Sequence, residues 1–292
     1  MKNVYVTGSK GLIGSSFSHS KGLRVIDVDI RKGPISWSKQ IKNPILVHLG
    51  WSSIPSMAID GDAEEEANTD VENTTRLVDS YIRAYKEGGI IFLSSSGAMY
   101  NPRIRRELDE SETPFPYTPY GKAKLRVERL LKDSIDKLVV LRCSNAWGGP
   151  IKVERRNGLI DRLIFNSVHG IESSITIDSE SRISCVHNND IANAICLSIK
   201  RLNEGKTIDQ LLYHVSSETR KVKEIVDLVT ETLGGNVREL GGSTVDTRIS
   251  SKKLEKELGW SPRHFVSENM IRVAAKMYKH MTTGGFEDAQ GQ

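Results

Sequence analysis

The chain has 292 residues, of which 38% are hydrophobic and 27% charged, a composition ordinary for one large globular domain or a large domain with a smaller lobe. Its 41 basic and 37 acidic residues give a net charge of +4, spread along the chain rather than gathered in a basic stripe, so we expect no nucleic-acid binding. The three cysteines form no CxxC pair and no even set, which argues against a disulfide framework and a metal site. Without an apolar run near about 18 residues or a signal peptide, we expect no membrane association and a cytoplasmic location.

The first half alternates short apolar runs with helical patterns. We expect strands at 3–7, 23–29, 44–50, 90–95 and 138–142, and helices at 11–20, 62–86 and 120–133. This alternation is typical of βαβ units. It predicts an α/β fold, a Rossmann-type doubly wound parallel sheet.

The regular alternation of expected strands and helices ends at about residue 150. Helices are expected at 157–169, 189–202, 221–233, 251–258 and 267–281, with short strands between them, such as 174–177 and 211–215. We interpret residues 1–150 as a dinucleotide-binding Rossmann domain and 151–281 as mainly a smaller, mixed substrate-binding lobe, from which some segments could return to the Rossmann domain. Residues 282–292 are expected to form a flexible tail.

A glycine-rich turn follows the first expected strand, with the spacing GxxGxxG over residues 8–14. Gly8 permits a tight turn, Gly11 lets the backbone approach a pyrophosphate, and Gly14 lets the helix pack against the strand. The helix that follows offers the free N–H groups of Leu12 and Ile13 and its positive dipole end to phosphate oxygens. The turn therefore predicts dinucleotide binding.

An acidic residue ends the second expected strand. Asp29 is placed to accept hydrogen bonds from the adenosine ribose hydroxyls, which favours NAD, and Asp27 points the same way from a deeper position. Three cations close by could instead pair with a 2′-phosphate, so NADP stays possible; they are Lys10, Arg31 and Lys32.

Hydroxyl groups and a Tyr-x-x-x-Lys pair supply the candidate catalytic residues. Ser96 lies at the end of a buried strand, and Tyr120 and Lys124 share one face of a helix. A nearby ammonium and the positive charge of nicotinamide move the pKa of a phenol toward the working range, so Tyr120 suits a general acid/base. Ser96 would bind the substrate oxygen, and Lys124 would also hold the nicotinamide ribose. Hydride transfer itself is cofactor chemistry.

Taken together, these residues resemble the extended short-chain dehydrogenase/reductase family, in particular its NAD-dependent nucleotide-sugar epimerase/dehydratase group. The resemblance rests on TGSKGLIG at 7–14, the acid at Asp29, LVHLGWSS at 46–53, SSSGAMY at 94–100, YGKAK at 120–124, LRCSNAWGG at 141–149, HNNDIANA at 187–194 and LGWSPR at 258–263.

The resemblance implies further roles. Leu49, Gly50 and Trp51 would line the cofactor cleft, Ser94 would lie against the nicotinamide half, and Asn145 would contact the substrate. The helices at 62–88 and 120–134 would form a homodimer interface. A nucleotide sugar would be the substrate.

Two departures from the family pattern narrow the chemistry. Gly97 and Ala98 follow Ser96 where the 4,6-dehydratases carry acidic residues, which argues against water elimination. Ile183 stands where family members often have an arginine that grips the diphosphate, with Arg182 one step away. The identity of the nucleotide therefore stays open.

The sequence favours NAD-dependent epimerisation of a nucleotide-linked sugar through a transient keto intermediate, with Tyr120 as acid/base. The first alternative is an NAD(P)H-dependent reductase of a keto-sugar or similar carbonyl, which Lys10 and Arg31 favour. The second is a non-catalytic, nucleotide-sensing member of the fold, against which the intact Ser96, Tyr120 and Lys124 argue.

Overall fold

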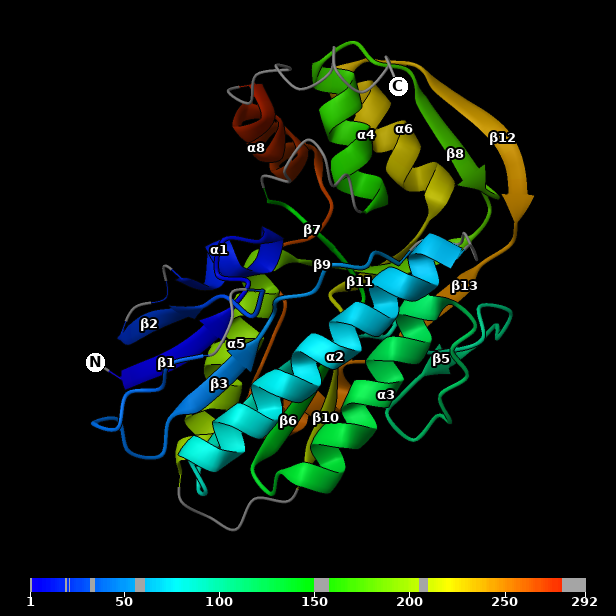
Figure 1. Ribbon diagram of the computed structural model, residues 1–292. Helices are drawn as coiled ribbons and strands as arrows, with labels where there is room; N and C mark the ends of the chain where they lie inside the picture. Colours follow the sequence, from blue (N-terminus) through cyan, green and yellow to red (C-terminus); the bar gives the residue numbers. More distant parts are fainter. Residues whose placement is uncertain are drawn as a thin grey trace.

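The computed structural model describes residues 2–18, 20, 22–31, 35–55, 61–149, 158–204 and 210–279. A six-stranded sheet forms its centre, with every neighbouring pair parallel and the order β10-β6-β4-β3-β1-β2 (Figure 1). Its strands are β1 (Lys2–Thr7), β2 (Leu23–Val28), β3 (Ile45–His48), β4 (Gly89–Ser95), β6 (Leu138–Cys143) and β10 (Leu211–Val215). The predicted Rossmann-type α/β fold is confirmed.

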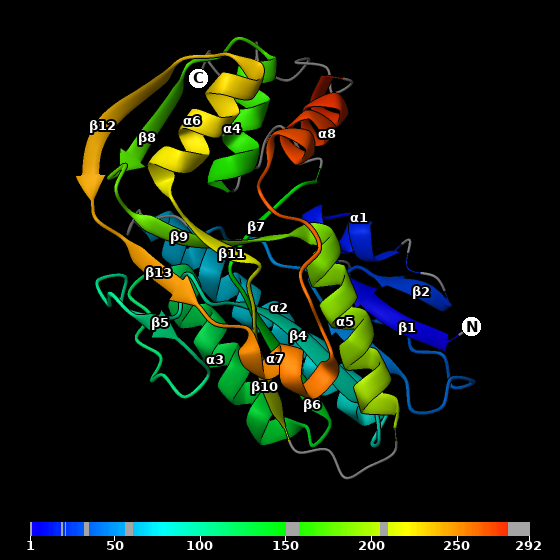
Figure 2. The same ribbon diagram turned by 180° about the vertical axis from the view of Figure 1, so that it is seen from behind.

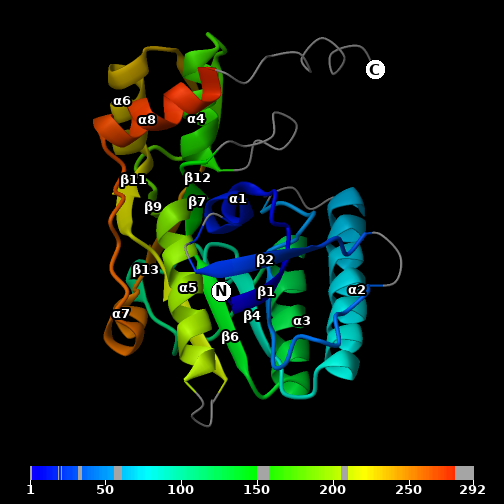
Figure 3. The ribbon, with the colours of Figure 1, turned by 90° about the vertical axis from the view of Figure 1, so that its left-hand side faces the viewer.

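Helices cover both faces of this sheet. Helices α2 (Gly61–Ala84) and α3 (Pro119–Ser134) lie on one face, and α1 (Leu12–Ser18) and α5 (Asn188–Asn203) on the other (Figure 3). Two apolar layers fill the space between helices and sheet, because the residues of the inner strands are buried on both sides, as expected for a parallel sheet. The predicted ends of these first-half elements agree with the observed ones to within two residues.

A second, smaller sheet joins distant parts of the chain. Its order is β11-β9-β13-β5, and β7 also pairs with β9 (Figure 2). The strands are β5 (Glu107–Leu108), β7 (Asn145–Trp147), β9 (Arg182–His187), β11 (Glu218–Lys221) and β13 (Asp246–Ile249). A two-stranded sheet adds β8 (Ser173–Ile177) and β12 (Val237–Ser243).

The remaining helices are α4 (Leu159–Val168), α6 (Val222–Leu233), α7 (Lys252–Leu258) and α8 (Glu268–Lys279). Helices α4, α6 and α8 pack together above the carboxyl ends of the large sheet, around an apolar cluster of their own (Figure 1). The strand expected at 211–215 is β10; it pairs with β6 in the large sheet rather than with strands of this lobe. Within the described residues, no helix is long and apolar enough to cross a membrane. The expected tail at 282–292 lies outside the described residues.

Helix α3 is held at its start by local sequence. The Thr118 hydroxyl caps the helix by accepting a hydrogen bond from the Gly121 N–H at 3.1 Å, and Pro119 occupies the first turn, where no N–H is needed. This start fixes where Tyr120 and Lys124 emerge above the sheet.

Candidate active site

The glycine turn after β1 has no room for a side chain at Gly8 or at Gly14. Gly8 has φ +69°, and a Cβ there would lie 2.7 Å from the Gly50 nitrogen. A Cβ on Gly14 would lie 2.1 Å from the Gly8 carbonyl oxygen. The Gly11 N–H closes the turn by donating to Gly8 O at 2.9 Å, and α1 begins at Leu12. The turn therefore lies against Gly50 in the loop after β3 and leads directly into α1, whose first N–H groups have no partner within the helix.

The loop after β3 is tied to the end of β1. The Thr7 hydroxyl oxygen accepts hydrogen bonds from the N–H groups of Leu49 and Gly50 at 3.1 and 2.9 Å. It is also hydrogen-bonded to His48 Nδ1 at 2.6 Å. Burial lowers the pKa of His48 to about 3, so this histidine is neutral. Residues 49–51 thus lie at the point where the strand order reverses, where α/β sheets bind their ligands.

The two aspartates near the end of β2 have different partners. Asp27 accepts a hydrogen bond from Ser9 Oγ at 2.6 Å and so holds the glycine turn. Asp29 follows the strand and forms an ion pair with Arg31, whose Nε lies 3.0 Å from the carboxylate and whose side chain is 74% exposed. Lys10 is exposed, and Lys32 lies outside the described residues.

Tyr120 and Lys124 lie beside Trp51, in the loop that the glycine turn approaches. Trp51, the neighbour of Gly50, packs its ring 6.3 Å from the Tyr120 ring, centroid to centroid. The Lys124 ammonium donates a hydrogen bond to the Leu93 carbonyl oxygen at 2.9 Å. Burial lowers the pKa of Lys124 to about 7, against the opposing effects of carboxylates nearby, and burial raises the pKa of Tyr120. The tyrosine is therefore a neutral phenol that additional positive charge would help to ionise.

The three serines at the end of β4 have different surroundings, which the sequence does not distinguish. The Ser95 side chain, near the Tyr120 hydroxyl, acts to lower the pKa of this phenol against the effect of burial. The Ser94 and Ser96 hydroxyls are buried, and neither has a hydrogen-bond partner in the described part of the chain. Sequence reasoning missed Ser95, although it stands between two residues that were singled out.

Asn145 begins β7, two residues beyond the strand that pairs with the serine-bearing β4. Its side chain is exposed, and its amide donates to the Ser184 carbonyl oxygen of β9 at 2.8 Å. Ile183, at the position where family members often have arginine, is buried in the apolar cluster of the lobe, whereas Arg182 is half-buried.

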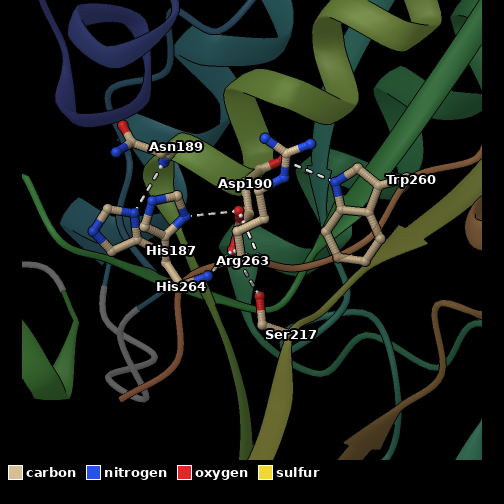
Figure 4. Close-up of polar contacts among 7 residues, drawn as sticks. All are labelled: His187, Asn189, Asp190, Ser217, Trp260, Arg263 and His264. Carbon is tan, nitrogen blue, oxygen red and sulfur yellow. Dashed lines mark hydrogen bonds and ion pairs between the residues drawn. The ribbon is translucent and has the colours of Figure 1, made fainter. Parts of the chain in front are cut away.

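Two motifs about seventy residues apart meet at Asp190 (Figure 4). Its buried carboxylate accepts hydrogen bonds from the backbone N–H groups of Arg263 and His264 and from the His264 ring at 2.8 Å. The Trp260 indole donates to the Asp190 carbonyl oxygen at 3.0 Å. The HNNDIANA and LGWSPR segments therefore form one structural junction that fixes the C-terminal segment against α5.

The parallel sheet, its strand order and the glycine turn after β1 define a Rossmann-type protein. The model of the NAD dependent epimerase/dehydratase family matches residues 4–211, and the chain belongs to that family.

Named relatives are similar at low identity. The chain is 25% identical over 240 residues to a probable UDP-arabinose 4-epimerase of Oryza sativa subsp. japonica, covering 73% of this chain and 57% of the relative. It is 25% identical over 212 residues to a putative UDP-glucose 4-epimerase of Methanocaldococcus jannaschii, covering 69% and 67%. The chain thus spans little more than half the length of the rice relative.

Solved structures share the fold. A UDP-glucose 4-epimerase from Stenotrophomonas maltophila, with bound NAD and formylated UDP-arabinopyranose, superposes with a TM-score of 0.79 at 19% identity, covering 96% of this chain and 99% of the other. A UDP-glucose 4-epimerase from Thermus thermophilus in complex with NAD gives 0.77 at 18% identity, covering 96% and 100%.

Proposed function

We propose that the protein catalyses NAD-dependent epimerisation of a nucleotide-linked sugar through a transient keto intermediate. The observation that carries the proposal is the placement of Tyr120 and Lys124 beside the loop that the glycine turn of β1 touches. A phenol and an ammonium, together with a glycine turn suited to phosphate, are the groups that alcohol–ketone interconversion with a dinucleotide needs. Membership of the epimerase/dehydratase family supports the same activity.

The residues present fit NAD. Added Cβ atoms at Gly8 and Gly14 would clash with the backbone of Gly50 and of Gly8, so only glycines allow the tight turn from β1 into α1 that pyrophosphate binding requires. Gly11, Leu12 and Ile13 would offer the pyrophosphate their backbone. Asp29 would accept from the adenosine ribose. We assign the remaining cleft lining to Leu49, Gly50, Trp51 and Ser94. NAD supplies the hydride acceptor and donor of the reaction.

The protein side chains would accept and return the proton of the sugar hydroxyl. Tyr120 takes the proton of the sugar hydroxyl when the carbinol is oxidised and returns it when the keto-sugar is reduced on its other face. Lys124 favours the phenolate of Tyr120 and holds the nicotinamide ribose. Ser96 and Asn145 would bind the substrate, and Ser95, which contacts the Tyr120 hydroxyl, joins the proposed catalytic group.

Names of the relatives suggest a UDP-linked hexose or pentose as the substrate. The test uses the purified chain with UDP-glucose and with UDP-arabinose, followed by NMR of the sugar anomeric protons, without added cofactor. Native mass spectrometry of the same sample reports whether NAD is retained. We expect conversion to the 4-epimer and a Tyr120→Phe variant that does not convert it; a stoichiometric demand for external NAD(P)H would refute epimerisation.

A second candidate is an NADPH-dependent reductase of a keto-sugar, which the Asp29–Arg31 ion pair favours. The guanidinium neutralises the carboxylate that would repel a 2′-phosphate, and it is exposed enough to turn toward one. This candidate predicts tighter binding of NADPH than of NADH. The cofactor requirement in the epimerisation assay separates the two functions.

We further propose that the protein works in the cytoplasm as a homodimer through α2 and α3. The outward faces of these helices carry rows of opposite charge. Glu65, Glu72 and Asp79 recur every seven residues on α2, and Lys122, Arg126 and Arg129 share a face of α3. A twofold axis between copies would bring each acidic row against a basic one.

A further inference from the structure

Trp51 lies directly against the buried ammonium of the site. The Lys124 Nζ atom is 3.7 Å from the centroid of the indole ring, well within the range of a cation–π interaction. Lys124 is only 4% exposed, so little water is available to solvate its charge. Cation–π contacts gain strength under such desolvation. The ring face is therefore a principal part of the environment of the ammonium.

The orientation of the indole is fixed by a short chain of hydrogen bonds. Its Nε1–H donates to Ser53 Oγ at 2.8 Å, and the Ser53 hydroxyl donates to Asp70 at 2.8 Å. The backbone N–H groups of Ser52 and Ser53 donate to the same buried carboxylate at 2.8 and 2.7 Å. Asp70 of helix α2 thus holds both the loop and the ring, which fixes the orientation of the indole.

The same indole also packs on the second member of the pair. Its ring and that of Tyr120 meet edge to face, with an interplanar angle of 85° and centroids 6.3 Å apart. One side chain therefore touches both Tyr120 and Lys124. Space filling alone does not require that the π face of the indole lie against a charge, as it does here.

We propose that Trp51 is a positioning residue of the Tyr120–Lys124 pair, holding the Lys124 ammonium on its ring face and setting its place relative to Tyr120. The catalytic meaning of this role rests on the proposed function, whereas the contact itself does not. The sequence had given Trp51 only a general place in the cofactor cleft. In the structure Trp51 contacts Lys124, and we assign it the positioning of the Lys124 ammonium.

The ammonium needs such a partner because burial alone destabilises it. The pKa of Lys124 falls to about 7 although carboxylates stand nearby. The titratable groups around it are Asp70 from α2, Glu128 and Tyr120 from α3, Cys143 from β6 and His48 from β3. An ammonium has three N–H donors. The Leu93 carbonyl takes one and the indole face engages a second, which leaves a third for the ribose of a dinucleotide.

The test observes Lys124 directly, in the full chain and without cofactor or substrate. The protein is labelled with lysine carrying ¹³C at Cε, and the Lys124 signal is identified by its loss in Lys124→Arg. We expect its ε protons to be shifted upfield by the indole ring current. Trp51→Phe should keep much of this shift, and Trp51→Leu should abolish it and lower the titration midpoint of Lys124 by about one pH unit.

A matched control removes a different tryptophan. Trp37 packs on Tyr5 and Tyr81, so Trp37→Leu should leave the Lys124 signal unchanged. An unshifted Lys124 signal in the wild-type protein would overturn the proposal even if Trp51→Leu fails to fold. So would an unchanged midpoint in a folded Trp51→Leu variant.

Turnover gives an independent readout. In the epimerisation assay, Trp51→Leu should lower kcat and move the pH profile, with KM little changed, and Trp51→Phe should restore most of the rate. If the NMR result holds while the wild-type chain turns over no nucleotide sugar, the proposed function fails and the positioning role of Trp51 stands.

Discussion

The Ser95 side chain acts to lower the pKa of Tyr120, while the neighbouring Ser96 hydroxyl is buried without a partner in the described residues. A hydroxyl that donates to the phenol oxygen favours the phenolate, so Ser95 bears on the ionisation of Tyr120. Ser96 is proposed to bind the sugar oxygen instead. Replacing Ser95 and replacing Ser96 by alanine are therefore expected to change kcat in different ways.

We predict that Ser95→Ala shifts the pH profile of kcat toward higher pH, because the phenolate loses a hydrogen bond. Ser96→Ala should lower kcat about equally at every pH, by roughly 10- to 100-fold, the loss of one hydrogen bond to a reacting oxygen. Steady-state rates across the pH range distinguish the two variants. An unshifted profile in Ser95→Ala would show that its contact has no catalytic role.

The sequence does not predict which serine contacts Tyr120. A run of three hydroxyls at a strand end predicts that one of them serves the site, and Tyr120 and Lys124 follow from their spacing. The contact itself depends on side-chain rotamers and on the turn after β4. Local patterns do not encode these.

At the level of elements, the glycine turn shows a strict steric requirement. We predict that Gly14→Ala destabilises the protein by about 1–3 kcal/mol, because its methyl group would lie 2.1 Å from the Gly8 carbonyl oxygen and α1 would have to move away from β1. NAD binding should weaken in parallel. Denaturant unfolding and a binding titration measure the two effects.

Gly97→Ala is the matched control for stability, because a Cβ at Gly97 meets no atom within 4 Å and its φ is not positive. Its free energy of unfolding should stay near that of the wild-type protein. Equal destabilisation by both substitutions would contradict the steric account of Gly14.

The charged rows on α2 and α3 make a prediction about assembly. If the proposed dimer pairs them, its dissociation constant should rise steeply between about 0.1 M and about 1 M salt, because the Debye length falls from about 10 Å to about 3 Å. Sedimentation equilibrium at the two ionic strengths measures this. Arg126→Glu should weaken the dimer at low salt, and a chain that is monomeric under all conditions would exclude the interface.

The sequence predicted long elements better than short ones. The apolar runs of β1, β4 and β6 and the periodic face of α2 carry many residues each, so their signal is strong. Strands β5 and β7 have two and three residues, too few for any periodicity. Pairing partners are also not local, which is why Leu211–Val215 was expected in the lobe although it extends the large sheet.

At the scale of the whole molecule, buried titratable groups control the response to pH. Burial lowers the pKa of His48 to about 3 and of His187 and His214 to about 4. Asp161 behaves in the opposite sense, because burial raises its pKa to about 7. Its carboxylate accepts from the Gly148 N–H at 3.0 Å and so ties α4 to the loop after β7.

We predict that stability falls as the pH drops from about 6.5 to about 5. In this range the unfolded chain takes up protons on three histidines that stay neutral when folded, while the folded chain binds a proton at Asp161. Three protons outweigh one, so acidification favours unfolding. Thermal unfolding at a series of pH values measures the slope.

Asp161→Asn isolates the opposing contribution. It removes the proton that the folded state takes up, so the loss of stability on acidification should become steeper than in the wild-type protein. The wild-type Asp161 adds stability at low pH that disappears as the pH rises through about 7. Parallel pH curves for the two proteins would show that this carboxyl is not perturbed.

The second sheet has a consequence for how the chain is made. It assembles β5, β7, β9, β11 and β13, which span residues 107–249. During synthesis β5 and β7 leave the ribosome long before β13, the strand that pairs with both β5 and β9, has been translated. Strand β7 can pair as soon as β9 emerges, but β5 must wait with an unpaired edge, exposed to chaperones and to other nascent chains, until Asp246–Ile249 arrives. Release of this one late segment is therefore expected to be the step that commits the chain to its native state.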